Sequence, residues 1–69
     1  MGALSLEKVC ELLGTTEVPG NAKELGVLRI RMGELLELNG EEWIREHRRM
    51  LLQQWRQVVK TGTIRGEHE

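Results

Sequence analysis

The segment comprising residues 41–60 constrains the fold more than any other part of this sequence. It carries apolar or packing side chains at helical spacing on one stripe: Ile44, His47, Leu51, Trp55 and Val58. Intervals of three and four residues are those of one helix face, so the segment is predicted to be one long amphipathic helix. Ile44, Leu51 and Val58 also recur every seven residues, which favours packing against a nearly parallel neighbouring helix.

Two further patterns predict helices earlier in the chain. Residues 6–13 have one apolar stripe, with Ser5 placed to cap the first turn and Gly14 placed for a left-handed residue at the end. Residues 22–38 begin with a predicted capping box, in which Asn21 and the residue three positions later bond to each other's backbone.

The composition agrees with these helical patterns. The chain has no Phe or Tyr, a single Pro, and no alternating apolar run suited to a strand. The predicted fold class is therefore all-α, in a single domain over residues 1–69 with a frayed tail at 61–69. Cys10 is the only cysteine, so no disulfide is expected within the chain, and it is predicted to pack as a small apolar residue. With no signal-like or membrane-spanning run in sight, a cytoplasmic location is expected.

The helix predicted over residues 22–38 is apolar on two sides. One side comprises Leu25, Leu28, Met32, Leu35 and Leu36, and the opposite side comprises Val27, Ile30 and Leu38. A helix with two apolar faces is expected to lie between two neighbours. A third, narrow strip of small residues is interpreted as a close helix crossing, with a binding groove as the alternative; it comprises Ala22, Gly26 and Gly33.

The pair Asn39-Gly40 separates this helix from residues 41–60. So short a break favours a long antiparallel helical hairpin, preceded by the short helix 6–13, and one kinked continuous helix is the alternative. A single hairpin cannot cover all of the apolar faces, so we expect two copies to form a homodimer that resembles a four-helix bundle. The predicted oligomer interface comprises Leu28, Met32, Leu35, Ile44, His47, Leu51, Trp55 and Val58.

The charges are unevenly distributed, although the net charge is only −1. Residues 47–66 contain five basic side chains and no acidic one. The last predicted helix also concentrates Trp, Met and Arg, which are enriched where proteins bind one another. The candidate partner surface comprises Trp43, Arg45, Arg49, Met50, Arg56 and Lys60. Phosphate contacts with nucleic acid are the alternative, and an ordinary solvated face is the simplest interpretation; a pI near 6.1 disfavours the nucleic acid.

No pattern of catalytic or metal-ligating residues is recognisable. His47, His68 and Cys10 are the only nitrogen or sulfur ligands, and they fall on different predicted elements. No catalytic residue, cofactor or metal is expected, and the protein is not expected to be an enzyme. The sequence therefore favours a non-enzymatic helical interaction module, such as a small regulator, adaptor or assembly subunit, that acts as a homo-oligomer.

Overall fold

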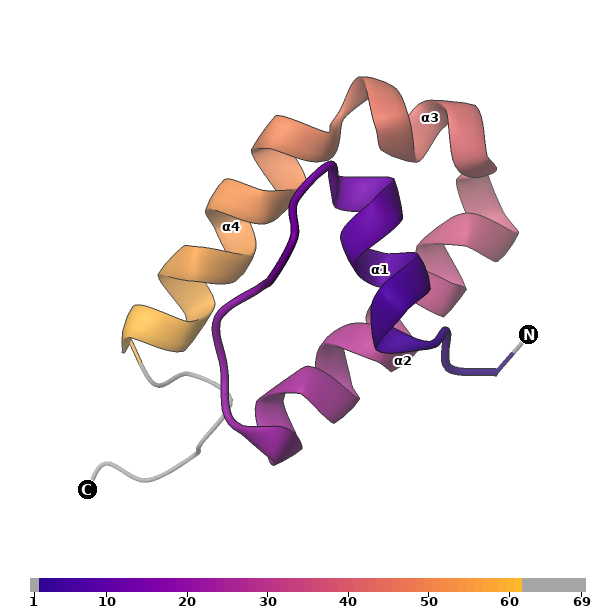
Figure 1. Ribbon diagram of the computed structural model, residues 1–69. Helices are drawn as coiled ribbons and strands as arrows, with labels where there is room; N and C mark the ends of the chain where they lie inside the picture. The colour runs from indigo at the N-terminus through magenta and orange to yellow at the C-terminus, as the bar shows by residue number, and fades with distance from the viewer. Residues whose placement is uncertain (1, 62–69) are drawn as a thin grey trace.

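The structure is a computed structural model that describes residues 2–61 (Figure 1). Within this range the chain forms four helices and no strand, which confirms the all-α prediction. The helices are α1 (Leu6–Leu13), α2 (Ala22–Asn39), α3 (Glu41–Glu46) and α4 (Arg48–Thr61). The predicted frayed tail, apart from the helical Thr61, lies outside the described residues.

The ends of α1 and α2 follow the predicted capping residues. The Ser5 hydroxyl accepts the Lys8 backbone N–H at 3.1 Å, and Gly14 ends α1 with φ 71°. In α2 the capping box is complete: Asn21 Oδ1 accepts the Glu24 N–H, and Glu24 Oε1 accepts the Asn21 N–H, each at 2.8 Å. These bonds satisfy backbone donors that the first helical turn leaves without an intrahelical acceptor.

The helix predicted over residues 41–60 is interrupted at His47. Its φ of −109° and ψ of 14° are not helical, and its N–H is shared between the carbonyls of Trp43 and Ile44, each at 3.1 Å. The imidazole Nδ1 lies 2.8 Å from the same Trp43 carbonyl, which can only accept, so Nδ1 donates. The resulting bend lets α3 and α4 follow the surface of α1 instead of continuing straight past it (Figure 1).

The predicted antiparallel hairpin is not confirmed. Helix α1 packs against α2, α3 and α4, whereas α2 and α4 have little direct contact. Figure 1 shows α1 lying in the space between α2 and α4. A helix of only two turns cannot hold itself together in water, so its apolar stripe has to be covered by neighbours. The two longer helices cover it from either side.

The core is built around the fully buried stripe of α1. Eight buried apolar residues form one cluster, drawn from every helix and from the loop after α1: Val9, Leu12, Leu13, Val18, Leu28, Met32, Ile44 and Trp55. Trp55 is only 2% exposed, and its indole Nε1 donates to the Pro19 carbonyl at 2.8 Å. This bond fixes the loop between α1 and α2 against α4, because a buried indole N–H needs an acceptor.

The segment before α1 crosses the side of α2. The Leu4 N–H donates to the Arg29 carbonyl at 3.2 Å, and Arg29 Nε donates to the Leu4 carbonyl at 2.7 Å. A Cβ at Gly33 would collide with the Gly2 carbonyl, so this glycine permits the crossing. The predicted close approach at the small-residue strip is therefore made by extended chain at Gly33, whereas a Cβ at Gly26 would meet nothing within 4 Å.

Candidate functional site

The structure places half of the predicted oligomer interface in the core of the single chain. Leu28, Met32, Ile44 and Trp55 are buried among neighbours from their own chain, so they are not available to a second copy. The helical spacing in residues 22–38 and 41–60 correctly identified an apolar face on each segment, but α1 covers much of both faces. The other four predicted residues are half-buried beside this core: Leu35, His47, Leu51 and Val58.

The predicted partner surface is divided by an ion-pair network. Arg45 pairs with Glu41 at 2.6 Å and with Glu11 at 3.5 Å, while Lys8 lies 3.6 Å from Glu11 and 3.7 Å from Glu41. The hydrogen bond from Arg45, with the nearby Lys8 charge, holds the pKa of Glu41 below its usual range, and the same bond raises the pKa of Arg45. Arg45 thus joins α3 to α1 and is removed from the outward basic surface.

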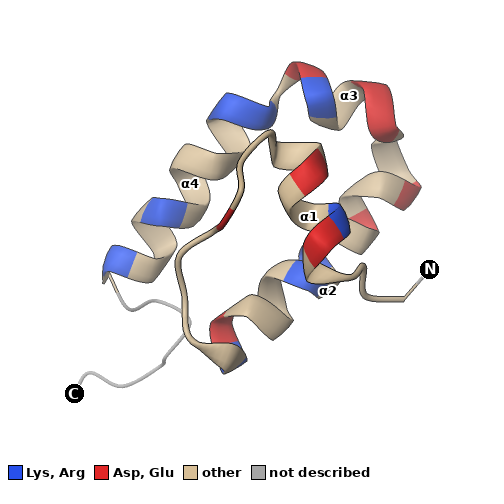
Figure 2. Cartoon of the chain, viewed as in Figure 1, with Lys and Arg blue, Asp and Glu red and all other residues tan. Residues whose placement is uncertain are grey.

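Three basic residues remain exposed along the outward side of α4. Arg49, Arg56 and Lys60 project at intervals of seven and four residues, with Gln53 between them. These intervals keep all four side chains on one helix face, which we call the α4 face. Figure 2 shows that α4 carries basic but no acidic residues. The α4 face is therefore a stripe of uniformly positive and amide side chains.

Two other members of the predicted partner surface border the α4 face differently. Met50 is 41% exposed and lies one helical position after Arg49. Trp43 is half-buried, and its ring stacks on His47 with centroids 4.1 Å apart and an angle of 22° between the planes. The stack supports the bend between α3 and α4, so Trp43 acts there as a structural residue.

The outward side of α2 is the surface that the interface prediction missed. Ile30 is 54% exposed and Leu38 is 80% exposed, and the neighbouring Val27 is half-buried. The sequence had assigned these three residues to a second apolar face of this helix. The helical spacing of these three residues was sufficient to identify this surface. The opposite face was predicted to be the oligomer interface because it carries more apolar residues. In the part of the chain that the structure describes, this second face has no covering helix (Figure 1).

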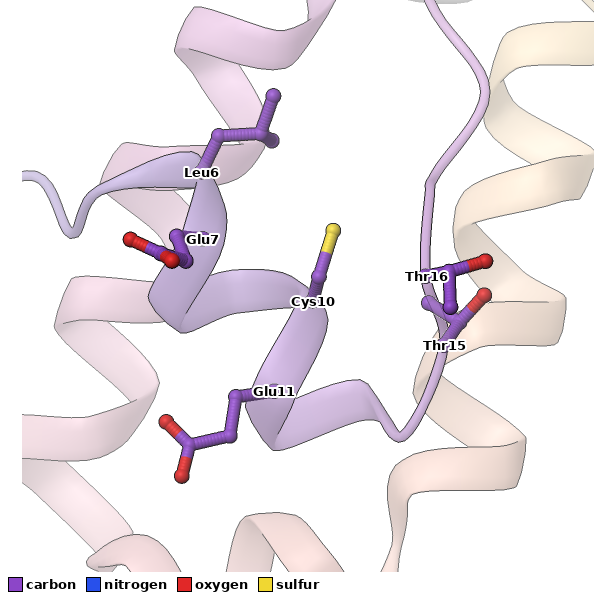
Figure 3. Close-up of a pocket in the computed structure, with 6 residues that line it drawn as sticks. All are labelled: Leu6, Glu7, Cys10, Glu11, Thr15 and Thr16. Atoms are coloured by element: carbon purple, nitrogen blue, oxygen red, sulfur yellow. The ribbon is translucent and has the colours of Figure 1, made fainter.

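A shallow depression lies beside Cys10 on α1 (Figure 3). Its volume is about 440 Å³, and it is lined by Leu6, Glu7, Cys10, Glu11, Thr15 and Thr16. Figure 3 shows the Cys10 sulfur pointing away from the two glutamates, Glu7 and Glu11. No basic group converges on this thiol from the lining residues, and Cys10 itself is half-buried and packs on the core. The depression brings together no catalytic set.

Among residues 2–61, no three potential metal-ligating side chains come together, and no helix combines the length and apolar character needed to cross a bilayer. Comparison with known proteins finds no matching family model, no similar curated protein and no similar solved structure. The candidate site therefore consists of two exposed helix faces, on α2 and on α4.

Proposed function

We propose that the protein is a non-enzymatic helical interaction module that works as a homo-oligomer and binds an acidic segment of another protein on the α4 face. The observation that carries this proposal is the α4 face itself. Arg49, Arg56 and Lys60 stand on one rigid helix without an acidic neighbour on that helix. A helix placing several bases in register can bind a matching row of carboxylates, with Met50 supplying adjoining apolar contact.

The total charge favours a protein over a nucleic acid as the partner. The chain has 10 basic and 11 acidic residues, whereas nucleic-acid-binding domains carry a clear basic excess. Helix α3, which contains three glutamates, ends directly before the first turn of α4 (Figure 2), and these acids would repel a phosphate backbone that ran along both helices. A short acidic helix of a partner protein would contact only the α4 face and would not reach these acidic residues.

Photo-crosslinking in cells tests this proposal directly. A photoreactive amino acid at Gln53, in the middle of the α4 face, is expected to form an adduct that protease removes and nuclease does not. Arg49→Glu should lower the adduct yield roughly tenfold, because a reversed charge at the contact replaces attraction by repulsion. Arg31→Glu, which makes the same charge change on α2, is the matched control and should leave the yield unchanged.

Two results would overturn the proposal. A nuclease-sensitive adduct would instead identify a nucleic acid on the α4 face, and its binding would then fall steeply with salt. The acid-free sequence of α4 is the feature that makes this the second candidate. An adduct that is equally abundant in the Arg49→Glu protein would show that the basic side chains do not select the partner.

A further inference from the structure

Four side chains on the outward side of α2 form a row whose spacing is the same from either end. Lys23, Val27, Ile30 and Glu34 follow one another at intervals of four, three and four residues. These intervals keep the row on a single helix face, with two apolar residues between a base and an acid. Lys23, Ile30 and Glu34 are exposed, and Val27 is half-buried.

The order of the exposed charges on α2 is unfavourable for the helix alone. Its exposed bases, Lys23, Arg29 and Arg31, all precede Ile30 or flank it, and its exposed acids, Glu34 and Glu37, follow. The helix dipole favours acids near the start of a helix and bases near its end. The opposite order of these exposed charges would be offset if the start of one α2 lay beside the end of another.

Gly26 provides a further observation on the same face. It lies four residues before Ile30, and a Cβ built on it would meet nothing within 4 Å. Glycine in the interior of a helix is destabilising relative to alanine, so this position needs a reason that packing within the described chain does not supply. Unlike Gly33, which the Gly2 carbonyl covers, Gly26 leaves room for the side chain of an approaching helix.

We infer that the outward face of α2 binds the α2 of a second copy of this chain in antiparallel orientation. Reversal of a row spaced four, three and four residues places Lys23 opposite Glu34 of the second copy and Val27 opposite Ile30 of the second copy. The two-fold axis repeats both contacts, so two ion pairs flank an apolar centre. The antiparallel arrangement also sets the start of each helix dipole beside the end of the other.

This inference rests on the proposed homo-oligomer and names the surface that forms it. The contact uses α2 residues that are exposed in the single chain, in place of the core residues that the sequence had suggested. It leaves the α4 face of each copy open, because that face belongs to another helix (Figure 1). A dimer would consequently present two separate partner-binding surfaces.

Sedimentation equilibrium of the full chain, from about 5 µM to about 500 µM, covers the weak association expected of so small an interface. The unaltered chain is expected to approach dimer mass with rising concentration. Lys23→Glu and Glu34→Lys should each weaken the dimer by about tenfold, since each replaces two attractive pairs by two repulsive ones. An equimolar mixture of the two variants should recover association, because its mixed dimer again pairs opposite charges.

The double variant Lys23→Glu/Glu34→Lys should also self-associate like the unaltered chain. A parallel pairing gives a different result, since Lys23→Glu alone would then leave the association unchanged. Arg49→Glu is the matched control on α4; it should lower crosslinking to the partner roughly tenfold and leave self-association intact. Circular dichroism of each variant confirms its helical content, and all of the changed side chains are exposed.

Two outcomes would overturn the inference. If the unaltered chain dimerises and neither charge reversal affects it, then α2 is not the contact, although the proposed homo-oligomer stands. If the chain stays monomeric throughout, both the α2 contact and the homo-oligomer fail, whereas partner binding on the α4 face is judged separately by the crosslinking result.

Discussion

Individual charged residues show how two of the helices, α1 and α3, are joined at the surface of the molecule. Lys8 and Glu11 on α1 meet Glu41 and Arg45 on α3 in one alternating group. Each exposed pair contributes little by itself, but here the group joins two short helices of eight and six residues. Each glutamate of the group lies near both bases, and Glu41 makes the shortest contact, 2.6 Å to Arg45, so its titration reports on the group.

The stabilising effect of Glu41 is expected to depend on pH. Arg45 and Lys8 lower the pKa of Glu41 below its ordinary value of 4.5 in the folded chain. A lowered pKa means that the folded state favours the ionised form, so the contribution is fully present above pH 4.5 and is lost as the pH falls through the folded pKa. Arg45, whose pKa is raised, stays charged throughout this range.

Urea unfolding of the unaltered chain and of Glu41→Gln at about pH 7 and about pH 3 measures this effect. The variant should have the lower midpoint at the higher pH, and the difference between the two midpoints should shrink at the lower pH, because protonation makes Glu41 resemble glutamine. Glu42→Gln, at an adjacent exposed glutamate that is not a member of this four-residue group, is the control. A difference that persists unchanged in acid would contradict the assigned ion pairs.

At the scale of helices, the local sequence signals at both ends of α1 and at the start of α2 were reliable. The Ser5 cap, the left-handed Gly14 and the capping box at Asn21 are each decided within four residues, and all three were predicted correctly. The break at His47 was not predicted, because no glycine or proline marks it. Its cause is the packing of α3 and α4 around α1, which is a contact between distant segments.

The two interior glycines of α2 illustrate the same distinction. Sequence placed Gly26 and Gly33 on one strip of small residues, yet only the structure separates their roles. Gly33 lies under the Gly2 carbonyl, and Gly26 has open space at its Cβ position. A crossing by extended chain leaves no periodic pattern, so sequence spacing alone could not tell which glycine was needed inside the fold.

Identical substitutions at these glycines are expected to have opposite effects. Gly26→Ala should raise the free energy of unfolding by about 0.5–1 kcal/mol, because alanine favours the helix and meets no neighbour. Gly33→Ala should lower the free energy of unfolding by about 1 kcal/mol or more, because its methyl group displaces the N-terminal segment.

Urea unfolding at a concentration low enough to keep the chain monomeric measures both changes. Each variant serves as the control for the other, since the helix and the added methyl group are the same. A destabilised Gly26→Ala chain would contradict the open space at that position, and an unaffected Gly33→Ala chain would contradict the crossing by Gly2 and Ala3.

At the scale of the whole molecule, the short first helix determines the arrangement. The helical periods of residues 22–38 and 41–60 identified four of the eight core residues: Leu28, Met32, Ile44 and Trp55. They did not reveal that α1 would occupy the space between the two longer helices, because periodicity tells which face is buried and not what buries it. The antiparallel hairpin and the oligomer interface at Leu28, Met32, Ile44 and Trp55 were both predicted without knowledge of where α1 lies.

The candidate site was predictable to the same extent. The basic stripe of α4 and the second apolar face of α2 were both visible as residue patterns. Sequence spacing could not show that Arg45 would pair with α1 or that Trp43 would stack on His47, since both depend on how α3 is placed. The larger apolar face of α2 was predicted to form the oligomer interface, although the smaller face, with Ile30 and Leu38, is the one that stays exposed.

A fragment comprising residues 22–61 tests the central role of α1. An antiparallel hairpin of α2 with α3 and α4 would keep its core in this fragment and unfold cooperatively. In the structure these helices instead rest on Val9, Leu12 and Leu13, so removal of α1 uncovers the apolar side of each. The fragment should therefore lose most of its far-ultraviolet helical signal and show no cooperative transition in urea.

The full-length chain with Leu12→Ala supplies a graded comparison. Leu12 has no exposed surface, so this change should lower the free energy of unfolding by about 2–5 kcal/mol while weakening only one contact point of α1. Cooperative unfolding retained by the fragment would revive the hairpin as the stable unit. Loss of structure in the fragment, with a weakened but cooperative Leu12→Ala chain, would establish that two turns of helix organise the other three.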